Sequence, residues 1–144
     1  MFHVRQGFTL PELLSVIVII GILTSVVTPP LGRALDQAAV HEGVERFAAL
    51  HATTRQLAIS RNAVVRLELD RTQRTAALSV RRTPAAWDTI ATYPLGSASI
   101  ACSNPTIIFG PLGLGYGTSN TRVIFTRGAA ADTVTTSRTG RLRR

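Results

Sequence analysis

An uninterrupted apolar stretch near the N-terminus constrains this chain more than any other feature. From Phe8 to Val27 the only charged residue is Glu12. A helix of that length spans about 30 Å, which is the thickness of the hydrocarbon core of a bilayer. The stretch is apolar on every side, as a membrane-spanning helix must be. We therefore predict a transmembrane or assembly helix over residues 8–28, preceded by a short basic leader over residues 1–7.

A cleaved secretory signal is the alternative interpretation of the same stretch. Such a signal ends in a small-residue site of the A-x-A type, whereas here the apolar residues run into Val26-Val27-Thr28-Pro29-Pro30. We therefore expect the helix to be retained. Arg5 on its N-terminal side favours a cytoplasmic N-terminus. This predicts a single-pass protein of the inner (plasma) membrane, whose globular part lies in the periplasm.

The residues around the start of this stretch form a specific motif. Residues 7–14 read Gly-Phe-Thr-Leu-Pro-Glu-Leu-Leu, which resembles the N-terminus of the type IV pilin and pseudopilin superfamily. The resemblance implies that a prepilin peptidase cuts between Gly7 and Phe8 and methylates the new amine of Phe8. It also implies assembly with other pilins or pseudopilins of the same filament, and contact with inner-membrane lipid before assembly.

Glu12 has two interpretations. Its carboxylate could simply be solvated at the level of the lipid headgroups. Alternatively, in a filament of packed apolar helices, Glu12 of one subunit could neutralise the N-terminal amine of a neighbour, which is the role that the superfamily resemblance implies. Leaving one member of such a buried pair alone costs about 3–5 kcal/mol. The motif favours the second interpretation.

The remainder of the chain predicts an α+β fold, in which the long N-terminal hydrophobic helix continues into a globular antiparallel β-sheet domain. Pro29, Pro30 and Gly32 are expected to break or bend the helix. Residues 29–62 form the C-terminal half of the helix, packed on the sheet, and residues 63–144 form a periplasmic β domain with a basic C-terminal tail. The expected apolar face of this half comprises Val40, Val44, Phe47, Thr54, Leu57 and Ala58.

Alternation of apolar and polar residues predicts a β-hairpin over residues 65–80, with a polar turn over residues 70–74. A loop with Pro84 and Trp87 is expected next. Shorter strands are expected over residues 89–93, 107–109, 122–126 and 133–137. The glycine-rich residues 110–117 lack the strand–turn–helix setting of a nucleotide fingerprint and predict a loop.

No enzyme, metal site or cofactor is predicted. His41 and His51 are ten residues apart without a third ligand in view, so they are expected to be surface or packing residues. A single cysteine, Cys102, excludes an intramolecular disulfide. The scattered carboxylates and histidines offer no nucleophile beside a base, so catalytic residues are absent from the prediction.

The C-terminal tail is strongly basic. From Arg122 to Arg144 there are six arginines and one acid, Asp132. Arginine suits bidentate phosphate contacts, and a mobile chain end could follow a phosphate backbone, so DNA is one expected partner. A solvated end that aids solubility or touches anionic lipid is the alternative. The candidate DNA-binding residues are Arg138, Gly140, Arg141, Arg143 and Arg144.

A second resemblance covers the C-terminal third. Residues 109–113, Phe-Gly-Pro-Leu-Gly, and residues 137–143, Ser-Arg-Thr-Gly-Arg-Leu-Arg, look like the GspH/FimT subgroup of minor pseudopilins and minor pilins. This implies a subunit at or near the tip of a type II secretion pseudopilus or a type IV pilus, supporting assembly and protein secretion. The alternative is a FimT-like minor pilin that binds DNA through its tail during natural transformation. Many relatives carry a cysteine pair in this domain, whereas Cys102 stands alone.

Overall fold

A computed structural model describes residues 8–116 and 120–144. For residues 26–29 it describes the backbone only. The predicted leader, including Gly7, lies outside these residues. The chain divides into two compact units, Met1–Ala34 and Leu35–Arg144. A single helix, α1 (Leu10–Ser60), runs through both.

The first unit contains the apolar half of α1. Its large side chains are exposed all round; Ile17, for example, keeps 63% of its surface accessible. Helix α1 is long and apolar enough to cross a membrane. An exposed surface of this composition is stable only when lipid or other apolar helices cover it.

Of the break or bend expected at Pro29 and Pro30, the break does not occur, because α1 runs without interruption through these residues. Two prolines remove two backbone donors. A helix that continues for thirty more residues can tolerate that loss when its far half is held by tertiary packing. The helix ends after Ser60 in a Schellman motif: the N–H of Asn62, with φ 46°, bonds to Ile59 O, and the N–H of Ala63 bonds to Ala58 O.

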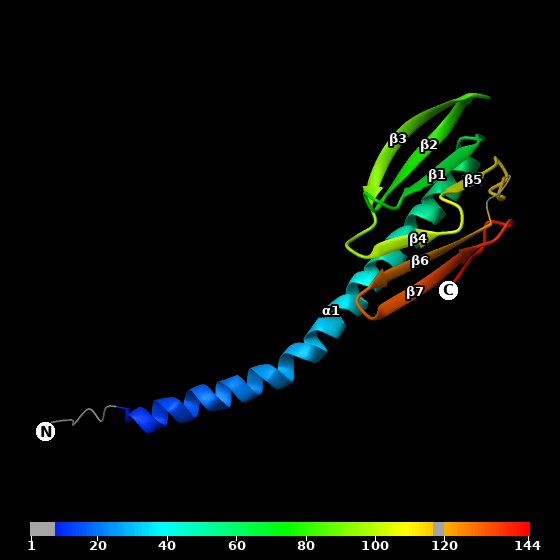
Figure 1. Ribbon diagram of the computed structural model, residues 1–144. Coiled ribbons are helices and arrows are strands. Elements are labelled where there is room, and N and C mark those ends of the chain that lie inside the picture. Colours follow the sequence, from blue (N-terminus) through cyan, green and yellow to red (C-terminus); the bar gives the residue numbers. More distant parts are fainter. Residues whose placement is uncertain (1–7, 117–119) are drawn as a thin grey trace, which may run out of the picture. The chain divides into compact units, whose positions relative to one another are not determined.

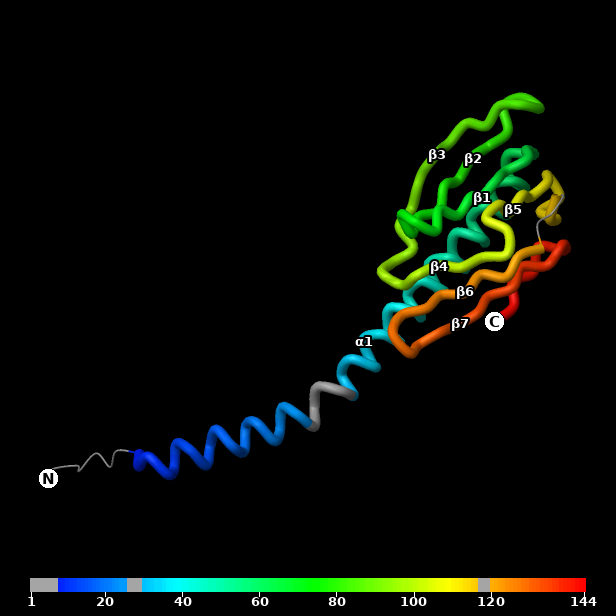
Figure 2. Tube along the Cα trace, in the orientation of Figure 1, coloured from blue at the N-terminus to red at the C-terminus, as the bar shows by residue number. Residues whose placement is uncertain are grey.

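Two four-stranded antiparallel sheets complete the second unit (Figure 1). The first has the strand order β3-β2-β1-β5 and the second the order β4-β6-β7-β8. The chain therefore leaves the first sheet for β4, returns to it for β5, and then completes the second sheet (Figure 2). The strands are β1 (Val65–Asp70), β2 (Thr75–Thr83), β3 (Ala86–Pro94), β4 (Ser99–Cys102), β5 (Thr106–Phe109), β6 (Thr121–Arg127), β7 (Ala130–Thr136) and β8 (Leu142–Arg143).

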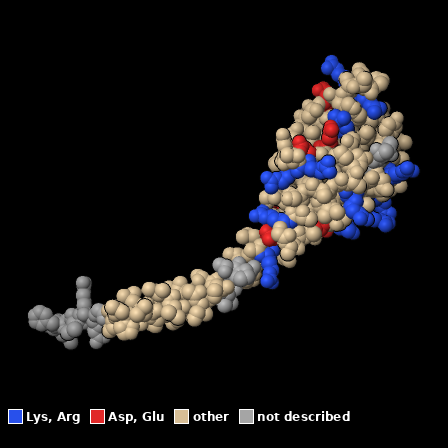
Figure 3. All heavy atoms as spheres, in the orientation of Figure 1, with Lys and Arg blue, Asp and Glu red and all other residues tan. Residues whose placement is uncertain are grey.

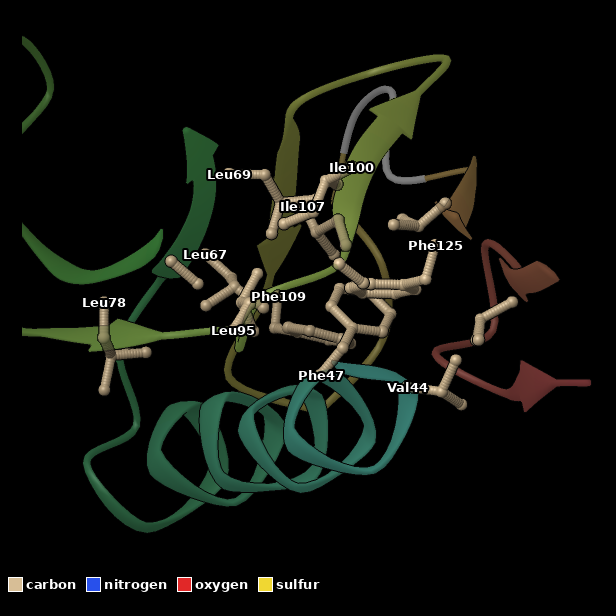
Figure 4. Packing of buried hydrophobic residues seen from close by; sticks show 14 of the residues in the cluster. Val44, Phe47, Leu67, Leu69, Leu78, Leu95, Ile100, Ile107, Phe109 and Phe125 are labelled. Carbon is tan, nitrogen blue, oxygen red and sulfur yellow. The ribbon is translucent and has the colours of Figure 1, made fainter. Parts of the chain in front are cut away.

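The core lies between the C-terminal half of α1 and the two sheets. Figure 4 shows Phe47 pointing from the helix toward Phe109 and Phe125, which come from different sheets. The rings of Phe47 and Phe125 lie 6.2 Å apart, and all three side chains are fully buried. The expected apolar helix face is confirmed, since Val40, Val44, Phe47, Thr54 and Ala58 are buried and Leu57 is partly buried.

The predicted hairpin is confirmed as β1 and β2, with Leu67 paired to Leu78. Its turn is fixed by Asp70, whose Oδ1 accepts the backbone N–H groups of Thr72 and Gln73 at 2.8 and 2.9 Å. Trp87 does not lie in a loop as expected but on β3, directly opposite Arg81. The reason is that only a tight turn separates β2 from β3, so pairing resumes at Ala86.

Candidate functional sites at the helix start and the arginine tail

Glu12 lies in the first turn of α1 and forms one half of a capping box with Thr9, the contact from its carboxylate back to the Thr9 backbone. The carbonyl oxygen of Thr9 accepts the backbone N–H groups of Glu12 and Leu13 at 3.1 and 3.2 Å. Oε2 of Glu12 reaches back to within 3.4 Å of the Thr9 backbone nitrogen. A threonine followed three residues later by glutamate is a known helix-start signature. Sequence reasoning missed this local role of Glu12, although the signal was present.

The helix start leaves the carboxylate of Glu12 able to take a further partner. The side chain is exposed, and its two contacts with Thr9 are long, at 3.4 and 3.5 Å. Phe8, the predicted first residue of the processed chain, precedes the helix and is 75% exposed. Gly7, the predicted cleavage position, lies outside the described residues.

The C-terminal arginines are held by an ordered turn. The N–H of Ser137 donates to the carbonyl oxygen of Arg141, and the N–H of Gly140 donates to that of Ser137, both at 2.9 Å. Beyond the turn, Leu142 pairs with Thr136 as β8 joins β7. The expectation of a mobile tail is therefore wrong: the last residues add a short strand to the second sheet.

Gly140 suits this turn because any side chain at this position would be strained. Its φ is +71°, and a Cβ there would lie 2.8 Å from the carbonyl oxygen of Gly113 and 3.1 Å from a ring carbon of Phe109. A second contact joins the same segments, since the N–H of Gly115 donates to the carbonyl oxygen of Arg138 at 2.8 Å. The glycine-rich loop and the tail therefore form one packed structure.

The candidate arginines differ in their contacts. Arg144 forms an ion pair with Glu45 of α1. The hydrogen bond from Arg144 lowers the pKa of the Glu45 carboxyl below its ordinary value. Arg138, Arg141 and Arg143 are exposed and have no carboxylate partner within residues 8–116 and 120–144. Three of the four predicted arginines thus keep guanidinium groups free for an anion.

A shallow groove of about 600 Å³ lies between the C-terminal half of α1 and the tail. The helix contributes His51 and Arg55, and the tail contributes Gly140, Arg141 and Leu142. The Nε–H of Arg55 donates to the carbonyl oxygen of Gly113 at 3.0 Å. Sequence reasoning did not place Arg55 here, although its spacing from His51 puts both on one helix face.

His51 is 4% exposed and lies at the floor of the groove. Its ring stands edge-on to Phe109, with centroids 5.0 Å apart. Burial, and secondarily the charge of Arg55, lower the pKa of His51 to about 4. The imidazole is therefore neutral at physiological pH, and the charge of the groove comes from arginines.

His51 packs and His41 is exposed beside Glu45, as expected of both histidines. In the part of the chain that the structure describes, no three His, Cys, Asp or Glu side chains are placed to hold a metal ion. Cys102 is half-buried on β4 as a free thiol.

The fold is shared with two kinds of filament subunit. The type IV minor pilin FimU of Pseudomonas aeruginosa superposes with a TM-score of 0.60 at 11% identity, over 72% of this chain and 86% of FimU. The minor pseudopilin EpsH of the Type 2 Secretion System of Vibrio cholerae superposes with a TM-score of 0.61 at 12% identity, over 73% of this chain and 94% of EpsH. No curated protein sequence matches the chain.

The N-terminal residues match a known sequence motif, which adds information to the likeness of the fold. Residues 3–28 match the family described as the prokaryotic N-terminal methylation motif. This motif implies processing by a prepilin peptidase and assembly with other pilins. The chain therefore carries the methylation motif at its N-terminus, and the long helix and antiparallel sheets that follow have the fold of these two solved structures.

Proposed function

We propose that this protein is a minor pilin or pseudopilin of the GspH/FimT type with no catalytic role. The chain is cut between Gly7 and Phe8 and methylated on Phe8. Before assembly it sits in the inner membrane with its N-terminus in the cytoplasm and its β domain in the periplasm. It then enters a filament at or near the tip, where Glu12 neutralises the N-terminal amine of a neighbouring subunit.

The main support for this proposal is that the motif is followed directly by an apolar helix whose side chains are uncovered. The matched residues 3–28 include Gly7, Phe8 and Glu12. The helix that follows exposes its large apolar side chains from Leu10 to Leu23. Such a helix needs lipid before assembly and neighbouring helices after it.

Mass spectrometry of the protein co-expressed with a prepilin peptidase tests the processing step. The chain should lose seven residues and carry one methyl group on Phe8. Gly7→Ala should remain at full length, while Gly21→Ala, a glycine change further along the helix with open space around it, should be processed normally. Cleavage of the Gly7→Ala chain at the wild-type rate would contradict the proposed site.

The filament that receives the subunit is either a type II secretion pseudopilus or a type IV pilus. The two structural neighbours come one from each kind of machine. Deletion of the gene, followed by assays of protein secretion and of surface piliation, separates them. We expect loss of one activity and retention of the other, and restoration by the wild-type gene.

DNA binding for natural transformation is a second candidate function. It is favoured by the exposed guanidinium groups of Arg138, Arg141 and Arg143, which have no carboxylate partner among the described residues. A gel-shift series on the full chain in non-ionic detergent tests it. If three arginines contact phosphates, the logarithm of the affinity should fall with the logarithm of salt with a slope of about −2.7. Equal retention of DNA by the Arg141→Ala/Arg143→Ala variant would remove the tail from the mechanism.

A further inference from the structure

The outward face of the first sheet carries a second cluster of arginines, built around one indole ring. Arg66 on β1 and Arg81 on β2 place their Cζ atoms 4.6 and 5.0 Å from the ring centroid of Trp87 on β3. Their strand neighbours Val65 and Val80 face the core. Since side chains alternate along a strand, both guanidinium groups stand on the opposite face, where solvent reaches them.

Arg81 is the arginine of this cluster that has no carboxylate partner among the described residues. Arg66 bonds to Glu68, with a distance of 3.0 Å between nitrogen and oxygen. Among the residues that the structure describes, no acceptor contacts the guanidinium of Arg81, and its Nε is buried, so hydrogen bonding is left to its terminal nitrogens. The Trp87 ring lies at cation–π distance from this guanidinium and restrains its position, and a guanidinium is a planar fork suited to phosphate.

Tyr116 links this cluster to the tail. Its ring centroid lies 5.8 Å from Cζ of Arg81, and the side chain is 53% exposed. The preceding residue, Gly115, bonds to the backbone of Arg138. The glycine-rich loop therefore runs directly from the sheet cluster to the tail turn that carries Arg138 and Arg141.

The charge of this unit favours a polyanion as the ligand. From Leu35 to Arg144 there are fourteen arginines and seven carboxylates, a net charge of +7. Figure 3 shows arginines in several separate patches on the visible face of the β domain, with fewer acidic side chains. Within the described residues, four of these arginines have a carboxylate partner: Arg46, Arg66, Arg127 and Arg144.

We propose that Arg81, oriented by Trp87, and the exposed ring of Tyr116 form a second contact point for single-stranded nucleic acid. This extends the DNA-binding candidate function and rests on it. The strand passes from the tail arginines across the glycine-rich loop to Arg81, which binds a phosphate while Tyr116 stacks an unpaired base. An arginine groove interleaved with aromatic rings is the usual arrangement for such binding.

Fluorescence anisotropy with a labelled oligothymidylate and the full chain in non-ionic detergent tests the proposal. Arg81→Ala should weaken binding about tenfold and make the salt slope shallower by about 0.7. Arg82→Ala is the matched control, because it removes the same charge from the next residue of β2, which is exposed and contacts no aromatic ring among the residues that the structure describes. It should change binding less than twofold. Equal effects of the two variants would overturn the proposal.

Further measurements separate the possible explanations of a weaker binding. Near-ultraviolet circular dichroism identifies loss of folding. The Arg81→Lys variant keeps the charge but lacks the planar fork, and it should bind weakly as well.

Comparison with the tail variant separates the two contacts. Weak binding by Arg141→Ala/Arg143→Ala with normal binding by Arg81→Ala would support DNA binding by the tail and refute this second contact. The reverse pattern refutes the tail and supports the sheet cluster. Competition by polyglutamate as strong as by oligothymidylate, or equal affinity for a duplex, would contradict a single-strand site.

Discussion

Arg144, the last residue of the chain, is joined by an ion pair to Glu45 of helix α1, ninety-nine residues earlier. The pair connects the end of the second sheet to the helix on which that sheet packs. It also removes Arg144 from the set of arginines able to meet a phosphate. If the tail binds an anion, we expect Arg138, Arg141 and Arg143 to contact it, because the guanidinium of Arg144 is already paired with Glu45.

Removing this ion pair should change the titration of Glu45. In Arg144→Ala the pKa of the Glu45 carboxyl should rise toward its ordinary value, because the hydrogen bond from Arg144 is the largest cause of its depression. A depressed carboxyl pKa contributes stability that is present above the unfolded pKa and lost as pH falls through the folded pKa. Carbon-detected NMR of the side chain follows this directly. Arg143→Ala, which removes a neighbouring charge, should leave the Glu45 titration nearly unchanged.

Gly140→Ala should destabilise the β domain. The substitution forces an alanine into a left-handed conformation and places its Cβ 2.8 Å from the carbonyl oxygen of Gly113. We expect a loss of about 2 kcal/mol in the free energy of unfolding, from strain and displacement together. Gly110→Ala is the control, since a Cβ there meets nothing closer than 3.9 Å. Denaturant unfolding of both variants should separate them, and equal midpoints would contradict the packing of the tail on the loop.

His51 should make the protein sensitive to mild acid. The folded pKa of about 4 lies below the ordinary value of 6.5, so the unfolded chain binds a proton first. Stability is therefore full above pH 6.5 and declines as pH falls toward 4, by at most about 1.4 kcal/mol per pH unit. His51→Phe should abolish this decline. Glu45 is present in both chains, so the difference between their unfolding curves isolates the histidine, and parallel profiles of variant and wild type would refute the assignment.

The sequence was most informative where one periodicity ran unbroken. Alternation over residues 65–80 predicted the β1–β2 hairpin, and helical spacing predicted the buried face that includes Phe47. Strands β4 and β8 were missed because each is short, with four and two residues. Their pairing depends on partners elsewhere in the chain: β4 is fixed by β6, and β8 by β7. No local pattern within two to four residues can specify such a partner.

The candidate sites also combine features that depend on the local sequence with features that depend on contacts between distant segments. The motif around Glu12 is local, and so is the capping box with Thr9, which could have been identified beforehand. The arginines of the tail were recognised by composition, but their environment was not. Arg55, Gly113 and Trp87 reach the sites through contacts between distant segments. Only the folded chain shows that Gly140 is required by a carbonyl of the loop rather than by its own turn alone.

Glu12→Gln should separate the two roles of the motif glutamate. Glutamine at this helix position can still complete a capping box, but it cannot neutralise an amine. If the charge is required, the Gln and Ala variants should both be processed and reach the membrane, and both should be missing from sheared filaments. An uncompensated buried charge costs about 3–5 kcal/mol, which lowers incorporation by two to four powers of ten.

Immunoblots of sheared filaments and of membranes measure both steps, and the mass of the processed chain shows whether cleavage and methylation have occurred. Thr9→Ala supplies the complementary control, since it removes the hydroxyl contact to Glu12 while the charge remains. This variant should assemble, because the carboxylate is still available to a neighbour's amine. Normal incorporation of Glu12→Gln, together with failure of Thr9→Ala, would show that the glutamate acts through the helix cap and would overturn the proposed pairing between subunits.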